Sequence, residues 1–222
     1  MTPRPAIHLI IVPLELVLFA TAVIVGSSLV GGMWKVVRAE GGSRAAASAP
    51  PEASASAALS PIFTPEVQYW AGKIAAWAAP YDLDPNLVAT VMQIESCGAP
   101  QAVSSSGAQG LFQVMPFHFG PDDVMQDPDT NAQRGIAYLA LGLARAGGNV
   151  GLALAGYNGG HSVIVRDSSL WSNETKRYWY WGTGVYEDAL SGQTASPRLQ
   201  EWLDAGGTSL CARAAQELGL AK

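Results

Sequence analysis

The chain has 222 residues, of which 49% are hydrophobic and only 14% are Asp, Glu, Lys or Arg. Such a chain is long enough for one domain with additional segments, and its apolar content excludes an intrinsically disordered protein. The formal net charge of -5 excludes a nucleic-acid binder that works through bulk positive charge. Two cysteines, Cys97 and Cys211, are too few for a disulfide scaffold or a cysteine-rich zinc site.

A long apolar segment near the N-terminus predicts a membrane span. The 19 residues Leu16–Trp34 carry no charge, and as a helix they would extend about 28 Å, close to the thickness of a bilayer core. Because the apolar character begins earlier, we expect membrane contact through residues 9–34, within an N-terminal anchor of residues 1–38. A cleaved signal peptide is the alternative, since Ala47–Ala49 has the small-residue form of a cleavage site.

Residues 39–62 are a predicted linker between this anchor and a globular region of residues 63–222. The segment consists mainly of Ala, Ser, Pro and Gly, which bury too little apolar surface to offset the entropy of ordering a chain. Lys35 and Arg38 follow the span, and charge counting alone would keep the C-terminal side in the cytoplasm. The expected orientation therefore depends on function.

The sequence from Phe63 onward predicts an all-α domain of about seven short helices. Three helix starts combine a capping residue with a proline: Thr64-Pro65, Asp84-Pro85 and Ser196-Pro197. Apolar residues then recur at intervals of three and four. Further helices are expected after Thr130, after caps at Asn149 and Asn173, and over Leu210–Leu218. Alternating strand patterns of useful length are absent.

Glu95 is the residue whose position in the predicted helices points to chemistry. It lies three residues after Met92 and four after Val91, so a helix would place its carboxylate on an apolar face. It also precedes the helix end that Gly98 and Pro100 impose, near the negative end of the helix dipole. Both effects predict a raised pKa, as a general acid requires. A partly exposed glutamate at a frayed helix end is the alternative.

Four sequence blocks follow one another in order between about residues 66 and 190. The first joins Glu95-Ser96, Ala102–Ser104 and the run Gly107–Pro116. The others are Asp127-Pro128 with Asn131, Gly135, Tyr138 and Leu139, then Ala155–Gly160, then Glu174–Tyr178. Together these blocks resemble the lytic transglycosylases of the soluble-lytic type, a family related to goose-type lysozyme.

The resemblance implies a lysozyme-like helical fold and an enzyme that uses no cofactor or metal. Its reaction would cleave the β-1,4 bond between N-acetylmuramic acid and N-acetylglucosamine in peptidoglycan. Glu95 would protonate the glycosidic oxygen, and the muramoyl C6 hydroxyl would then close on the anomeric carbon, giving a 1,6-anhydro end. No second catalytic carboxylate is assigned, since the family implies that the substrate's acetamido group assists and that ionised Glu95 serves as the base.

The resemblance also assigns substrate-binding roles to Ser104, Gln113, Met115, Tyr157, Asn158, Glu174 and Tyr178. Ser104 would hydrogen-bond and orient Glu95, whereas Gln113, Asn158 and the Tyr157 hydroxyl would contact the sugar or its acetamido group. Met115 would line the cleft, and Tyr178 would approach its catalytic end. Glu174 would either bind substrate or supply negative charge in the first turn of its helix.

Two departures from the family pattern put the shape of the cleft in question. Gly98 stands where a bulkier residue is frequent, and His161 stands where a proline is common. His161 is expected either to contact a sugar or to lie on the surface. The segment Leu170–Trp181 is rich in Trp and Tyr, and we expect most of these rings in the core, with one or two at the cleft.

Two further groups of side chains are candidates, one for a calcium site and one for a disulfide. Asp127, Asp129 and Asn131 imitate the start of a calcium loop, but the glycine and final glutamate of such a loop are missing, so we interpret them as loop and helix-cap residues. Cys97 and Cys211 would pair only if the domain lies in an oxidising compartment, and the sequence does not show how far apart they are.

The leading hypothesis is a membrane-anchored lytic transglycosylase whose catalytic domain faces the cell wall, because such an enzyme has no substrate in the cytoplasm. The alternatives are a lysozyme-type hydrolase of the same bond and a non-catalytic glycan-binding module of a cell-envelope apparatus. Expected partners are peptidoglycan glycan strands, the membrane and envelope machinery, but not nucleic acid.

Overall fold

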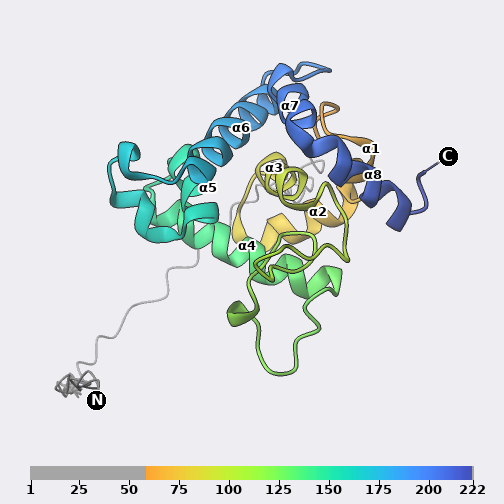
Figure 1. Cartoon of the computed structure of the whole chain (residues 1–222), viewed down its shortest axis with the longest axis horizontal. Coiled ribbons are helices and arrows are strands. Elements are labelled where there is room, and N and C mark those ends of the chain that lie inside the picture. The colour runs from red at the N-terminus through yellow and green to blue at the C-terminus, as the bar shows by residue number, and fades with distance from the viewer. Residues whose placement is uncertain (1–58, 222) are drawn as a thin grey trace, which may run out of the picture. The chain divides into compact units, whose positions relative to one another are not determined.

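The computed structural model describes residues 59–221, whose regular secondary structure is helical (Figure 1). The predicted all-α fold is confirmed for this part of the chain, which contains isolated β-bridges in one loop but no β-strand. Between residues 59 and 221, no helix is long and apolar enough to cross a membrane. The predicted anchor and most of the predicted linker lie outside the described residues. Ser60 and Ile62, at the end of that linker, are buried against the domain.

Eight α-helices follow one another in the described residues, with short turns of 3-10 or π-helix between some of them. The α-helices are α1 (Pro65–Gln68), α2 (Ala71–Ala78), α3 (Pro85–Ser96), α4 (Pro128–Arg145), α5 (Val150–Gly159), α6 (Asn173–Leu190), α7 (Pro197–Trp202) and α8 (Thr208–Glu217). The short turns are η1 (Ala79–Tyr81), η2 (Pro116–His118), η3 (His161–Val165), η4 (Ser168–Leu170) and η5 (Leu203–Gly207).

The predicted helix starts at Pro65, Pro85 and Pro197 are confirmed. The cap predicted at Asn173 is one residue late, because the Ser172 hydroxyl accepts the hydrogen bond from Thr175 N at 3.0 Å. The first apolar run is split into α1 and α2 at Trp70. There the backbone leaves the helical region, and the indole Nε1 of Trp70 donates to the Gly98 carbonyl at 2.9 Å.

Helix α3 runs through the middle of the domain (Figure 1) and packs against α1, α2, α6 and α8. Every residue from Leu87 to Gln93 is buried, so this helix has no solvent-facing side over that stretch. A helix buried all round is characteristic of a protein core. The C-terminal turn of α3, which carries Glu95, is therefore held by its neighbours, which excludes the frayed helix end.

A disulfide between Cys97 and Cys211 joins the end of α3 to α8, which answers the question that the sequence left open. Cys97 is the C-cap of α3 and has a φ of 52°, and Gly98 follows with a φ of +85°. A Cβ at Gly98 would lie 2.9 Å from the Glu66 carbonyl oxygen and 3.2 Å from the Trp70 ring. The glycine is thus required where the chain turns sharply beside α1.

A long irregular segment connects α3 to α4 and carries the first signature block. Asn131 of α4 is fully buried and holds this segment in place through hydrogen bonds. Its Oδ1 accepts a hydrogen bond from Phe112 N, and its Nδ2 donates to the carbonyl oxygens of Gln109 and Met125, each at 2.8 Å. Because these backbone groups belong to an irregular loop, one side chain supplies partners that a helix or sheet would otherwise provide.

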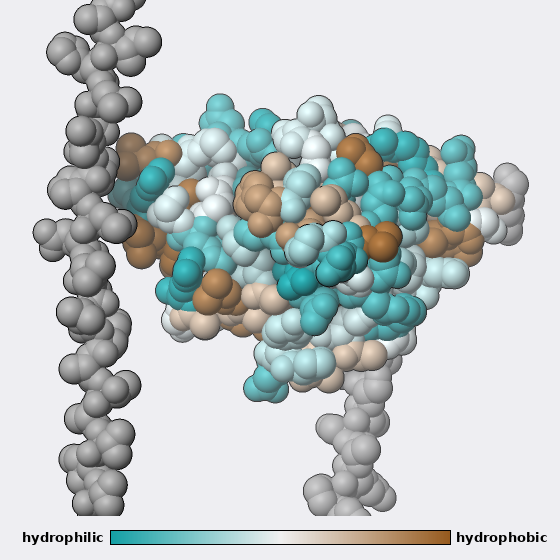
Figure 2. Space-filling model, turned by 90° about the horizontal axis from the view of Figure 1, so that it is seen from below, coloured by the Kyte–Doolittle hydropathy of each residue, from teal (hydrophilic) through white to brown (hydrophobic). Residues whose placement is uncertain are grey.

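The interpretation of the acidic residues near α4 as loop and cap residues is consistent with their contacts. Asp127 caps α4 by accepting from Thr130 N at 2.8 Å. Asp129 pairs with Lys73 of α2 at 2.8 Å on the surface. On the face of the domain shown in Figure 2, hydrophobic residues are scattered among hydrophilic ones, as is normal for a protein surface.

Candidate active site

Glu95 lies in the last turn of α3 and faces a cavity of about 230 Å³. The cavity is lined by Ile94, Glu95, Asn158, Glu174, Arg177, Tyr178 and Trp181. Four of these residues come from the first turns of α6, where positions 174, 177, 178 and 181 share one side of the helix. The end of α3 and the start of α6 therefore build the walls around the carboxyl group together.

Burial raises the pKa of Glu95 to about 8. The residue keeps some exposed surface, but its carboxyl group lies deep among protein atoms, so the charged form is poorly solvated. The nearby Tyr178 hydroxyl lowers the pKa, and the negative charge of Glu174 raises it further. At neutral pH the carboxyl group holds its proton and is ready to donate it.

A second cavity, of about 280 Å³, adjoins the first through Asn158, which lines both. Gln113, Met115 and Tyr157 line this second cavity with residues of η2, α4 and the end of α5. We call the two cavities together the cleft. Of the residues assigned by resemblance, the cleft brings together Glu95, Gln113, Met115, Tyr157, Asn158, Glu174 and Tyr178.

Ser104 is the predicted site residue that the cleft does not include. Its hydroxyl accepts a hydrogen bond from Ala108 N at 3.0 Å, and its own N–H donates to the Ala108 carbonyl at 3.0 Å. Both bonds close a tight turn of the signature loop, and the expected hydrogen bond to Glu95 is not formed. Ser104 therefore shapes the loop that carries Gln113.

Gln113 has a left-handed backbone, with a φ of 46°, which is unusual for a residue with a side chain. Its Nε2 donates to the carbonyl oxygens of Ala102 and Gly110 at 3.2 and 2.9 Å. With the amide nitrogen held by the loop, the Oε1 atom stays available to accept a hydrogen bond in the cleft.

Tyr157 and Asn158, at the end of α5, form the wall between the two cavities. The Tyr157 hydroxyl donates to the Phe112 carbonyl at 2.8 Å, so its only donor already has a partner. Burial and the neighbouring Glu95 raise the pKa of Tyr157 well above its ordinary value. Asn158 Oδ1 accepts from Thr175 at 2.9 Å, and its Nδ2 donates to Glu174 at 3.4 Å. Glu174 is thus both in the first turn of α6 and in the cleft.

The Tyr178 hydroxyl is buried and lies near the carboxyl group of Glu95. It is near enough to influence the pKa of Glu95, yet within residues 59–221 it forms no well-aligned hydrogen bond. Burial raises the pKa of Tyr178 well above its ordinary value. A neutral hydroxyl without a hydrogen-bond partner can form a hydrogen bond either with the carboxyl group of Glu95 or with a ligand.

Several cleft residues were not assigned from the sequence. Arg177 and Trp181 share a side of α6 with Glu174 and Tyr178, so helical spacing would have found them. Phe117 and His118 come from the turn η2, which no helical or strand period marks. Only the folded loop places these two rings beside Met115.

His161 is partly exposed and lies beside Tyr138, which lines the cleft. Its ring stacks on Tyr138 at 4.0 Å with 12° between the planes. Its Nδ1 lies 2.9 Å from Arg145 Nη1, and its Nε2 lies 3.1 Å from the Tyr138 carbonyl oxygen. Because Arg145 can only donate, Nε2 carries the proton. Burial and the positive charge of Arg145 lower the pKa of His161.

Comparisons with known proteins identify relatives of this chain. Residues 72–179 match the model of the family described as "Transglycosylase SLT domain". The chain is 40% identical over 114 residues to the "Transglycosylase" of Enterobacteria phage PRD1, covering 50% of this chain and 40% of that protein. It is 32% identical over 106 residues to "Membrane-bound lytic murein transglycosylase C" of Edwardsiella ictaluri, covering 39% of this chain and 30% of that protein.

Among solved structures, the lytic transglycosylase Slt of Pseudomonas aeruginosa matches 68% of this chain and 24% of its own, with 19% identity and a TM-score of 0.40. This chain spans less than half the length of the curated relatives named above. The family match covers the end of α3, the signature loop and the start of α6, which carry the residues of the cleft. The helical domain of this chain therefore matches the family model of the transglycosylase SLT domain over residues 72–179, which is just under half of the chain.

Proposed function

We propose that the chain is a peptidoglycan lytic transglycosylase with Glu95 as its general acid and base. The observation that carries the proposal is a carboxyl group whose pKa burial raises to about 8, in a cleft shared with Asn158, Glu174 and Tyr178. A carboxylic acid that is protonated at neutral pH can protonate a leaving-group oxygen. The substrate would be the glycan strand of peptidoglycan, in accord with the relatives' names.

The proposed reaction needs one protein carboxyl group in two roles. Glu95 donates its proton to the glycosidic oxygen as the bond to the anomeric carbon breaks. The C6 hydroxyl of the muramoyl unit then attacks that carbon, and its proton passes to the carboxylate of Glu95, which restores the acid. Gln113 Oε1, Asn158 and the Tyr178 hydroxyl would hold the substrate's polar groups meanwhile.

Hydrolysis is the second candidate, and Glu174 is the observation that favours it. This residue puts a second carboxylate into the cavity of Glu95. Glycoside hydrolases of the usual kind work with two carboxylates on either side of the bond. The two reactions differ in their products, because a 1,6-anhydro end is lighter than a reducing end by one water.

For location, we propose that the domain is membrane-anchored and faces the cell wall. The buried disulfide Cys97–Cys211 supports an oxidising compartment for the domain. The predicted span at residues 9–34 would supply the anchor. A relative from Edwardsiella ictaluri is named as membrane-bound.

The test is digestion of purified peptidoglycan by the full chain, with the products identified by mass spectrometry. Wild type should release muropeptides with anhydro ends. Glu95→Gln should lower the rate by at least about 100-fold, because amide and carboxyl are similar in shape but the amide has no acidic proton. Glu201→Gln, at an exposed glutamate outside the cleft, is the matched control and should retain the wild-type rate.

Two results would contradict the proposal in different ways. Products with reducing ends would show that the enzyme hydrolyses the bond instead of forming a 1,6-anhydro end. Loss of activity in Glu174→Gln would then identify Glu174 as the second catalytic carboxylate. Unchanged lysis by Glu95→Gln would remove Glu95 from the reaction altogether.

A further inference from the structure

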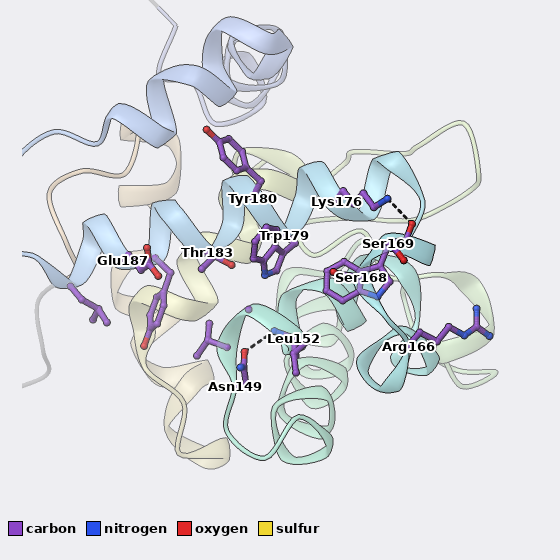
Figure 3. Close-up of a pocket in the computed structure, with 15 residues that line it drawn as sticks. Asn149, Leu152, Arg166, Ser168, Ser169, Lys176, Trp179, Tyr180, Thr183 and Glu187 are labelled. Atoms are coloured by element: carbon purple, nitrogen blue, oxygen red, sulfur yellow. Dashed lines mark hydrogen bonds between the residues drawn. The ribbon is translucent and has the colours of Figure 1, made fainter.

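A groove of about 1120 Å³, separate from the cleft, lies along α6 (Figure 3). It runs between the outer side of α6 and the start of α5, and the segment that contains η4 closes one end. On α6, residues 176, 179, 183 and 187 face the groove, whereas residues 174, 178 and 181 face the cleft. At about 100° per residue these sets lie on opposite sides of the helix.

Polar side chains of the groove pack closely around Gly151, near the start of α5. A methyl group added there would lie 2.8 Å from Trp179 Nε1, 3.3 Å from Thr183 Oγ1 and 3.4 Å from Asn149 Oδ1. An indole nitrogen, a hydroxyl and an amide oxygen thus pack closely beside Gly151, where a larger residue would force the Trp179 ring to shift. Within residues 59–221, the buried Thr183 hydroxyl has no hydrogen-bond partner. Buried polar groups of this kind are satisfied by a ligand or by an ordered water.

Aromatic rings line the groove beside Gly151. Trp179 is 40% exposed and meets the buried Trp171 edge to face, with ring centroids 6.3 Å apart. Tyr180 and Tyr186 extend the wall along α6. Most rings of Leu170–Trp181 are in or against the core, as expected, whereas Trp179 and Tyr180 are exposed and lie at the groove. Exposed rings beside converging hydrogen-bond groups match a sugar, which has apolar ring faces and polar edges.

The end of the groove near η4 carries positive charge. Arg166 and Lys176 lie there (Figure 3), and neither forms an ion pair with any described residue. Lys176 Nζ donates to the Ser169 carbonyl at 2.9 Å. The neighbouring Asp167 offsets one of the two charges. The net positive end suits the carboxylates of a peptide attached to a sugar strand, while Glu187 lies farther along the groove.

We propose that this groove is a second binding site for a peptidoglycan glycan strand, distinct from the cleft. Sugar units would stack on Trp179 and direct an acetamido or hydroxyl group toward the Thr183 hydroxyl, with the acidic stem peptide toward Arg166 and Lys176. The site rests on the proposed function, since the same polymer would occupy both sides of α6. It would hold the enzyme on the wall while the cleft acts on another strand segment.

The test measures binding of the full chain to purified insoluble peptidoglycan by sedimentation. All variants carry Glu95→Gln so that the polymer stays intact. Trp179→Ala removes the stacking surface, Thr183→Val removes the hydroxyl at nearly constant shape, and Gly151→Ala displaces the Trp179 ring, whose Nε1 would lie 2.8 Å from the added methyl group. Each should weaken binding by about threefold to tenfold, the range expected for one aromatic contact or hydrogen bond. Tyr69→Ala, which removes a 57% exposed ring outside both sites, is the matched control.

Two further measurements make the result decisive. Binding to glycan strands freed of their stem peptides should depend on Trp179 as before, but no longer on Arg166→Ala. With Glu95 restored, the groove variants should cleave a small soluble muropeptide at the wild-type rate. If the wild-type chain cleaves neither muropeptide nor peptidoglycan, the proposed activity is refuted, but the binding result still stands. Binding by all three groove variants equal to that of Tyr69→Ala would overturn the second site. Thermal unfolding confirms that each variant is folded.

Discussion

Glu95 shows how one residue obtains its chemistry from its surroundings. Its place on the apolar side of α3 follows from its spacing to Met92 and Val91, and the structure confirms the raised pKa that this spacing predicts. The sequence did not predict the contribution of Glu174, because that residue lies 79 positions later, on another helix. Long-range neighbours of this kind emerge only when α3 and α6 are brought together.

The raised pKa of Glu95 leads to a pH dependence with a defined sign. A general acid works only while it is protonated, and the folded protein holds this proton up to about pH 8. The rate of peptidoglycan cleavage should therefore be flat through neutral pH and fall about tenfold per pH unit above that value. A kcat/KM profile from pH 5 to pH 10 measures it.

Removing the charge of Glu174 provides the control for this profile. The negative charge of Glu174 raises the pKa of Glu95, so in Glu174→Gln the alkaline limb should move to lower pH. A limb that stays in place in this variant, or that lies near pH 5 in the wild type, would contradict the assignment of the limb to Glu95.

At the scale of elements, the helices follow from local signals and the signature loop does not. Caps at Asp84, Asn149 and Ser196 lie where the sequence predicted them. The loop between α3 and α4 has no period, and its shape depends on a buried asparagine from α4. The family resemblance alone named the residues of this loop, and tertiary contacts decide that Gln113 faces the cleft while Ser104 closes a turn.

The dependence of the loop on α4 is testable at Asn131. In Asn131→Ala, the Phe112 N–H and the Gln109 and Met125 carbonyls lose their partner. Unsatisfied buried polar groups cost about 1–3 kcal/mol each, so we expect the free energy of unfolding to fall by about 3 kcal/mol or more. Urea unfolding measures this change.

Asn173→Ala is the matched control, since Asn173 is exposed at the start of α6. It should change stability by less than about 0.5 kcal/mol. If both variants unfold at the same urea concentration, the loop does not rely on Asn131.

At the scale of the whole molecule, function and charge counting give opposite predictions for orientation. Lys35 and Arg38 would keep the domain in the cytoplasm, whereas a wall-cleaving domain with a buried disulfide belongs outside. We expect the domain to be degraded when protease is added to intact spheroplasts of cells that express the full chain. A cytoplasmic marker protein must stay intact in the same sample. Full protection of the domain until the cells are permeabilised would refute the outward orientation.

The disulfide between Cys97 and Cys211 also changes what a single cut in the backbone can do. The two cysteines are 114 positions apart, so the segment from the end of α3 to α8 forms a covalent ring. A protease that cuts one exposed peptide bond in this ring opens it but releases no fragment. The α6 wall of the cleft would remain tied to the helix that carries Glu95, and the nicked protein would separate into two pieces only under reducing conditions.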